Sequence, residues 1–148
     1  MRLVLINPNN RLVGTVNLKV SRWNRYLVWK PLGLLVVAGA TPPGWDVTVV
    51  DENLGVPDYD AMDRPDLVGI TAFSSQAPRA YAVAAHFRGI GVPVVMGGAH
   101  ASMRLDEALE HADAVVQGEA EGVWPRVLDD AARGELERVY EGGPADMD

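Results

Sequence analysis

Short apolar runs alternate with longer amphipathic stretches along this chain of 148 residues. Short runs rich in branched apolar residues and bounded by Gly, Pro, Asn or Asp are typical of buried strands, whereas apolar positions that recur every three or four residues indicate helices. The strand pattern occurs at Arg2–Ile6, Asp46–Val50, Leu67–Ala72, Val92–Met96 and Ala114–Gln117. The helix pattern occurs at Leu32–Ala40, Ala77–Arg88, Glu121–Arg133 and a stretch that includes Leu105 and Leu109.

Strands that alternate with helices predict an α/β fold with a parallel sheet and right-handed crossovers. We expect a doubly wound, Rossmann-like or flavodoxin-like sheet of five strands in the order 2-1-3-4-5, with helices on both faces. Residues 1–141 are expected to form this domain and residues 142–148 a linker or tail. Ligands of such sheets bind beyond the carboxyl ends of the strands, at the switch point between strands one and three.

Candidate binding residues therefore follow the predicted strands directly. They are Asn7 and Pro8 after the first strand, Phe73, Ser74 and Ser75 after the third, Gly97, Gly98 and His100 after the fourth, and Gly118 and Glu119 after the fifth. The glycines allow a ligand to approach the backbone closely, or they form a tight turn and nothing more. Ser74 and Ser75 are suited to bind a ligand or to cap the next helix.

The histidine and the acidic residues of this set leave several roles open. His100 is suited to be a metal ligand, a proton carrier, an orienting hydrogen-bond group, or a loop histidine bonded to backbone. No second ligand-type residue lies at metal spacing, so no metal site built by the protein is predicted. Glu119 and Glu121 resemble an acid/base pair, but the helix dipole alone favours acidic residues in a first helical turn. No catalytic residue is predicted in this chain.

Composition narrows the chemistry further. The chain has no cysteine, which excludes disulfides, thiolate nucleophiles and any iron–sulfur cluster held by its own cysteines. The longest apolar run, nine residues from Leu32 to Ala40, is far shorter than the roughly twenty that a membrane-spanning helix needs. With no basic-then-apolar signal segment at its start, we expect a cytoplasmic protein that does not bind a membrane.

Charge is distributed unevenly along the sequence. The net charge is −7, yet residues 1–45 hold six Lys or Arg and no acidic residue. This basic stretch is suited to attract a phosphate-bearing ligand or an acidic partner, or it is a solvated charge patch. Nonspecific nucleic-acid binding is not expected of an acidic protein. Trp23 and Trp29 lie among the basic residues and are suited to cover a flat cofactor or to pack onto the domain.

Several segments, in the same order and with similar spacing, resemble the N-terminal domain of cobalamin-dependent radical S-adenosylmethionine enzymes. They are Leu3–Pro8, Pro31–Leu35, Val47–Asp51, Pro65–Thr71, Val94–Ala101 and Asp113–Glu119. The resemblance implies a Rossmann-like domain that holds cobalamin across the strand ends, with the nucleotide tail displaced from cobalt and threaded into the domain. It also implies that the loops after strands one, three, four and five supply the contacts, and that a bulky side chain at Gly98 blocks cofactor uptake without unfolding the domain.

Two departures qualify what the resemblance implies. The DxHxxG signature of cobalamin domains that supply a histidine to cobalt is missing, because Asn7, Pro8 and Asn9 follow the first strand. No histidine ligand to cobalt is therefore expected, and the lower face of the corrin is left to water or to a bulky side chain such as Trp23 or Trp29. The CxxxCxxC that binds an iron–sulfur cluster is also absent. The radical S-adenosylmethionine part must then be another domain or subunit, acting in methyl transfer or cyclisation.

Rival classes remain at this stage. A response-regulator receiver domain shares the expected strand order, but it needs acidic residues where Asn7 and Phe73 stand. A self-sufficient nucleotide or flavin enzyme would need a phosphate-binding loop, and neither G-x-G-x-x-G nor a P-loop is present. A non-catalytic interaction domain that keeps the fold without the cofactor is not excluded.

Overall fold

The computed structural model describes residues 1–10 and 31–143. Its strands are β1 (Arg2–Asn7), β2 (Asp46–Asp51), β3 (Leu67–Thr71), β4 (Val94–Gly97), β5 (Ala114–Gln117) and β6 (Val139–Glu141). Its helices are α3 (Leu32–Gly39), α4 (Ala77–Gly89), α5 (Ala99–Met103), α6 (Leu105–His111) and α7 (Trp124–Arg133), and a short 3₁₀ helix covers Ser74–Gln76.

The strands form one sheet in the order β2-β1-β3-β4-β5-β6, and all the pairs are parallel. The predicted fold class and the order of its five strands are thereby confirmed. The strand count was wrong by one, because β6 pairs with β5 at the edge of the sheet. With three residues and one fully buried side chain, Tyr140, β6 is too short to show the period-two pattern that marks a strand in sequence.

Two helical regions also differ from expectation. The stretch around Leu105 and Leu109 contains two short helices, because Arg104 leaves the helical conformation with φ −124° and ψ 55°. The last helix begins at Trp124 rather than at Glu121, and Pro125 lies in its first turn, where a missing N–H costs nothing. Within the described ranges, no helix is long and apolar enough to cross a bilayer.

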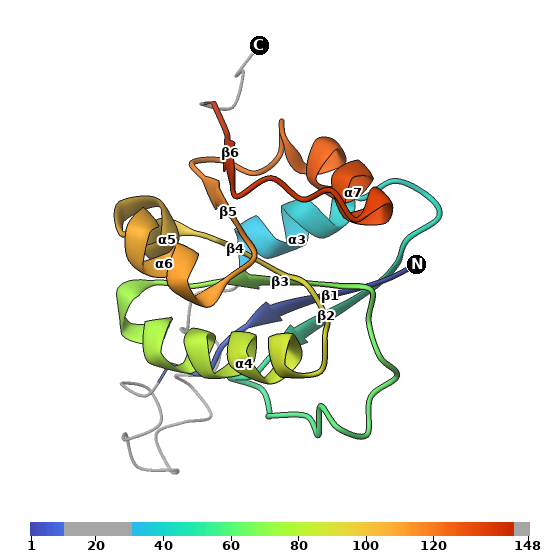
Figure 1. Ribbon diagram of the computed structural model, residues 1–148. Helices are drawn as coiled ribbons and strands as arrows, with labels where there is room; N and C mark the ends of the chain where they lie inside the picture. The colour runs from blue at the N-terminus through green and yellow to red at the C-terminus, as the bar shows by residue number, and fades with distance from the viewer. Residues whose placement is uncertain (11–30, 144–148) are drawn as a thin grey trace.

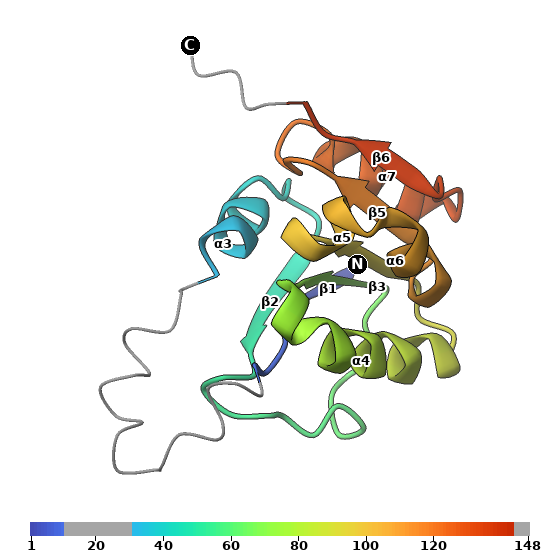
Figure 2. The ribbon, with the colours of Figure 1, turned by 90° about the vertical axis from the view of Figure 1, so that its left-hand side faces the viewer.

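Two apolar layers hold the helices to the sheet. The ribbons show α3 and α4 on opposite sides of the sheet (Figure 1 and Figure 2). Side chains alternate between the two faces along each strand, as at Val4 and Leu5 on β1. The even positions of β1 pack with α4, α5 and α6, where Phe87 of α4 is fully buried. The odd positions pack with α3 and α7, where Trp124 and Leu128 are buried. Helices therefore cover both faces, as predicted.

A buried carboxylate ties the loop after β2 to α4. The side chain of Glu52 is fully buried and forms two bonds with the Arg79 guanidinium, at 2.9 Å to Oε1 and 2.7 Å to Oε2. The Tyr59 hydroxyl and the Asn9 backbone N–H also donate to it, at 2.9 and 3.0 Å. Burial alone would raise the pKa of Glu52, but the bonds from Arg79, Asn9 and Tyr59 outweigh burial and leave the pKa below its usual value.

We expect Arg79→Met to lower the free energy of unfolding by about 3 kcal/mol at pH 7, because Glu52 would remain buried without its cation. A carboxyl whose pKa is lowered by folding stabilises the protein above its unfolded pKa and loses that effect as the pH falls through the folded pKa. The difference between wild type and variant should therefore shrink below about pH 4.5, the usual carboxyl value. Urea unfolding at pH 7 and pH 4 measures it, and an equal difference at both pH values would contradict the ion-pair explanation.

Candidate functional site

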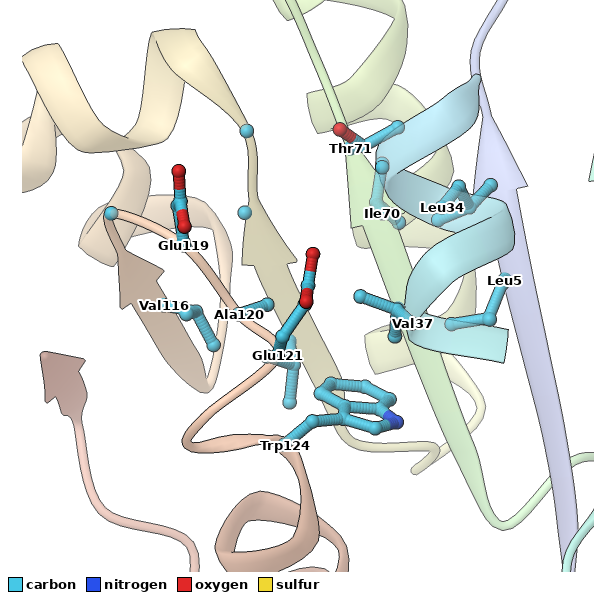
Figure 3. A pocket seen from close by; sticks show the side chains of 16 residues that line it. Leu5, Leu34, Val37, Ile70, Thr71, Val116, Glu119, Ala120, Glu121 and Trp124 are labelled. Atoms are coloured by element: carbon cyan, nitrogen blue, oxygen red, sulfur yellow. The ribbon is translucent and has the colours of Figure 1, made fainter. Parts of the chain in front are cut away.

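A cavity of about 300 Å³ opens at the carboxyl ends of the strands, between the sheet and helices α3 and α7. Its lining comes from β1, β3, β4 and β5, so the cavity includes the switch point of the strand order between β1 and β3. Figure 3 shows the side chains that surround it. They are Leu5, Gly33, Leu34, Val37, Gly69, Ile70, Thr71, Val95, Gly97, Gly98, Val116, Gly118, Glu119, Ala120, Glu121 and Trp124.

The base of the cavity is apolar and its largest wall is a fixed indole ring. In Figure 3 the Trp124 ring lies below the opening, across from Val37 of α3. Trp124 is almost fully buried, and its Nε1 donates to the Thr41 hydroxyl at 3.0 Å. The Thr41 hydroxyl in turn donates to the Val37 carbonyl at 2.9 Å. Helices α3 and α7 are thereby linked across the cavity, which holds the indole in one orientation.

A glycine in the middle of β3 makes room for this wall. A Cβ at Gly69 would lie 2.8 Å from Leu5 Cδ2 and 3.6 Å from Trp124 Cη2. Glycine in the interior of a strand is otherwise unfavourable, and it often marks a place where another group approaches closely. The sequence pattern predicts Gly69 as part of a strand and not as a site residue. A glycine inside an apolar run nevertheless indicates close approach by another group.

Polar groups lie at the mouth of the cavity. The Thr71 hydroxyl belongs to the end of β3, and the carboxylates of Glu119 and Glu121 extend from the loop after β5 toward the opening (Figure 3). The cavity thus combines an apolar interior with hydrogen-bonding groups at its entrance, as small-molecule sites commonly do. Thr71 and Trp124 were not among the predicted site residues, because Thr71 fell inside a predicted strand and Trp124 inside a predicted helix.

The two glycines at the end of β4, Gly97 in the strand and Gly98 directly after it, have different roles. Gly97 lies on the same face as Val95, and a Cβ there would make only ordinary contacts, 3.9 Å from Val116. Gly98 has φ +93° and ψ −179°, a conformation that is essentially limited to glycine. A Cβ at Gly98 would also lie 2.7 Å from the Thr71 hydroxyl and 3.0 Å from the Ala72 backbone. The expectation that a bulky side chain at Gly98 would spare the fold conflicts with this geometry.

A second close crossing borders the cavity at the loop after β5. Gly118 has φ +84°, and its Cβ would lie 2.5 Å from the Gly142 carbonyl oxygen. A Cβ on Gly142 would collide with the Glu119 carbonyl oxygen. The Gly142 N–H donates to the Gln117 carbonyl at 2.8 Å, which extends the pairing between β5 and β6. Gly142, directly after β6, therefore lies beside Gly118 and Glu119 at the cavity mouth.

On the α4 side of the same edge, predicted site residues form a hydrogen-bonded cluster. His100 is only 7% exposed, and its Nδ1 lies 3.0 Å from the Ser74 hydroxyl. Its Nε2 lies 2.9 Å from the Tyr81 hydroxyl, which donates to Glu107 at 2.9 Å. The His100 side chain is thus bonded to side chains rather than to backbone. Both of its ring nitrogens have partners within the fold.

The residues after β1 are held by a separate set of bonds. Gln76 donates from Nε2 to the Asn7 side-chain oxygen at 2.9 Å and to the Pro8 carbonyl at 2.7 Å. Asn7 donates to Asp51 at 3.1 Å, and Ser75 accepts from Asn10 at 3.0 Å. Asn7 is buried, so its amide supports the loop from beneath.

The twelve predicted site residues thus fall into separate groups. Gly97, Gly98, Gly118 and Glu119 line the cavity. Asn7, Pro8, Ser74, Ser75 and His100 belong to the bonded clusters beside it. Phe73 is half exposed at the same edge, and Trp23 and Trp29 lie outside the described residues. That each of them contacts a cofactor stays a prediction. Within residues 1–10 and 31–143, no three His, Asp or Glu side chains gather to hold a metal ion.

We expect Gly98→Ala to lower the free energy of unfolding by about 2 to 3 kcal/mol, because a side chain is strained at this φ and meets the end of β3. Gly97→Ala is the matched control and should change stability by less than about 1 kcal/mol, since its Cβ has space. Urea unfolding of the two variants distinguishes the roles. Equal losses would show that the backbone conformation of Gly98 is not the constraint.

Curated relatives share most of this chain. It is 41% identical over 118 residues to bacteriochlorophyllide d C-8(2)-methyltransferase and 36% identical over 110 residues to bacteriochlorophyllide d C-12(1)-methyltransferase, both of Chlorobaculum tepidum. These matches cover 76% and 74% of the chain. An uncharacterised methyltransferase of Pyrococcus horikoshii is 35% identical over an alignment of 150 residues, gaps included, that covers 90% of the chain. The chain spans only 25%, 24% and 30% of the lengths of these relatives.

A family profile covers the site as well as the fold. The profile described as B12 binding domain matches residues 19–128, which include β2 to β5 and every cavity residue except Leu5. The match agrees with the observed parallel sheet and with the resemblance found in the sequence. The chain therefore belongs to the B12-binding domain family.

Proposed function

We propose that this chain is the cobalamin-binding module of a methyltransferase whose catalytic part lies in another domain or subunit. Membership of the B12-binding family supports the cofactor, and the printed names of the relatives support methyl transfer. The resemblance to cobalamin-dependent radical S-adenosylmethionine enzymes makes a radical S-adenosylmethionine domain the partner that we propose. These 148 residues contain no cysteine to hold an iron–sulfur cluster, so the partner must supply one.

The cavity at the switch point is the observation that carries this proposal. Cobalamin has a flat, largely apolar base at the end of its nucleotide tail, and a narrow apolar cavity beside a sheet suits such a group. The cavity of about 300 Å³ is lined by Leu5, Val37 and Trp124 and has glycines where a ligand must pass the backbone. We propose that the tail enters between the sheet and helices α3 and α7.

The residues of the mouth would hold the polar parts of the tail. The Thr71 hydroxyl, the backbone at Gly97 and Gly118, and the carboxylates of Glu119 and Glu121 surround the opening. The corrin would then lie over the carboxyl ends of the strands, where Phe73 is exposed. Bound cobalamin supplies a cobalt centre that can carry a methyl group, and this chain's part is to bind it and to fix its orientation.

The surroundings of the histidines agree with cobalt binding without a histidine ligand. Both ring nitrogens of His100 are bonded to Ser74 and Tyr81. His111 stacks on Tyr81 with ring centroids 3.9 Å apart, and His86 lies on α4 next to Asp60. These are the three histidines of the chain. None of the three lines the cavity, so we propose that the domain leaves cobalt without a histidine.

The proposal is tested by titrating the purified chain with hydroxocobalamin, followed by gel filtration and a visible spectrum. We expect wild type to co-elute with cobalamin and to give a base-off spectrum, because the tail base leaves cobalt when it enters the cavity. Gly97→Leu should bind at least about tenfold more weakly, since its side chain would occupy the cavity. The matched control is Gly89→Leu at the end of α4, where a Cβ meets nothing within 4 Å, and it should bind like wild type.

Each outcome of the titration has a defined meaning. No binding by folded wild type would reject the cofactor module and favour an interaction domain without cofactor. Binding with a base-on spectrum, or equal binding by Gly97→Leu, would reject the cavity as the tail site.

We further expect His100→Ala to leave the visible spectrum of bound cobalamin nearly unchanged, because His100 is not a cobalt ligand. Hydroxocobalamin at saturating concentration, with unbound cofactor removed, allows the spectra of variant and wild type to be compared. A clear shift of the absorption bands in the variant would show that His100 reaches the cobalt.

A further inference from the structure

A continuous chain of hydrogen bonds runs from an exposed serine into the protein beside the cavity. Ser74 is exposed, and its hydroxyl lies 3.0 Å from Nδ1 of the buried His100. Nε2 of His100 lies 2.9 Å from the Tyr81 hydroxyl and 3.4 Å from Glu107 Oε1. Tyr81 donates to the same Glu107 oxygen at 2.9 Å, and Arg104 pairs with the other at 3.0 Å. None of these side chains lines the cavity.

The acidic end of the chain determines where the protons lie. The bond from Tyr81 is the main cause that lowers the pKa of Glu107, with smaller contributions from His100 and Arg104, so Glu107 is a carboxylate and accepts only. The single hydroxyl proton of Tyr81 is donated to it, which leaves the Tyr81 oxygen as an acceptor toward His100. Nε2 of His100 must then carry the ring proton of the neutral imidazole.

This tautomer determines whether the Ser74 hydroxyl donates or accepts toward a ligand. With the proton on Nε2, Nδ1 of His100 has a free lone pair and accepts the Ser74 hydroxyl proton. The Ser74 oxygen is left with lone pairs and no proton to donate. A side chain that could otherwise donate or accept therefore presents an acceptor to the exposed edge of the sheet.

Ser74 lies where a ligand held in the cavity extends over the strand ends. It follows Thr71, which lines the cavity, by three residues. The backbone N–H of His100 also donates to the Ala72 carbonyl at 3.1 Å, so the histidine is attached to the residue that follows β3. The acceptor at Ser74 and the mouth of the cavity therefore belong to one edge.

We propose that Ser74 Oγ accepts a hydrogen bond from a primary carboxamide N–H on the rim of the bound corrin, and that Tyr81 and Glu107 are positioning residues that act through His100. This assignment rests on the proposed function, since the corrin carries several such amides on its periphery. A carboxylate in place of the amide would bring two acceptors together and be disfavoured. Ser74 thus selects the amide form of one corrin side chain.

The tautomer is tested without any ligand. Long-range ¹H–¹⁵N NMR of the histidine rings at pH 8 should show His100 protonated on Nε2 alone. Glu107→Ala should release this preference, because Tyr81 is then free to donate to Nε2. Glu107→Gln is the matched control and should retain it, because its amide oxygen still accepts from Tyr81. Protonation on Nδ1 in wild type, or no response to Glu107→Ala, would overturn the positioning role.

The ligand assignment is tested with cobalamin monocarboxylates, in which one corrin amide is hydrolysed to a carboxylate. Ser74→Ala should bind hydroxocobalamin about five- to tenfold more weakly than wild type. One monocarboxylate should bind wild type at least about tenfold more weakly than hydroxocobalamin does. The same monocarboxylate and hydroxocobalamin should bind Ser74→Ala with equal affinity. Thr48→Val, which removes an exposed hydroxyl on β2, is the control and should behave like wild type in both titrations.

The outcomes distinguish the failure of this inference from the failure of the proposed cobalamin-binding function. Failure of wild type to bind hydroxocobalamin would reject the proposed function and, with it, the corrin as the ligand of Ser74. Binding by wild type with Ser74→Ala unchanged would reject the inference alone. If every monocarboxylate lost the same affinity, relative to hydroxocobalamin, for Ser74→Ala as for wild type, Ser74 would not contact a carboxamide.

Discussion

The close contact between the turn after β4 and the end of β3 is the constraint on which the rest of the candidate site depends. Gly98 turns the chain with φ +93° at a place where any Cβ would meet Thr71 and Ala72. The turn allows the backbone N–H of His100 to donate to the Ala72 carbonyl at 3.1 Å. Gly97 before the turn borders the cavity, and His100 after it lies on the opposite side of the sheet. One backbone crossing thus fixes both parts of the edge relative to each other.

The two parts differ in chemistry because strand side chains alternate between faces. On the α3 and α7 side, Leu5, Val95 and Trp124 surround an apolar cavity. On the α4 side, polar side chains bond to one another. There Glu52 joins α4 to the loop after β2, and His100 joins Ser74 to Tyr81. An apolar recess for one end of a ligand and a stiff polar surface for the other suit a large cofactor that is both flat and rich in amides.

Much of this architecture was predictable from local patterns, and the exceptions have physical causes. Apolar runs located five strands, and four of them, β1, β3, β4 and β5, are buried on both faces and so are nearly continuous in sequence. Their order was expected from the fold class. The edge strand β6 was missed because three residues with one buried side chain carry no period. The glycines at positions 97 and 98 were correctly placed at the edge, but their separate roles depend on φ and on the neighbours of each Cβ, which no pattern contains.

The sequence by itself determined the fold class, the edge at which we propose that a ligand binds, the absence of cysteine and the resemblance to cobalamin-binding domains. These follow from residue type and spacing, which are local properties. Only the tertiary structure decided that Trp124, Gly69 and Thr71 share a cavity. It also decided that Ser74, His100, Tyr81 and Glu107 form one chain of bonds. These residues come from separate elements, and their contacts exist only after the crossovers of the sheet bring those elements together.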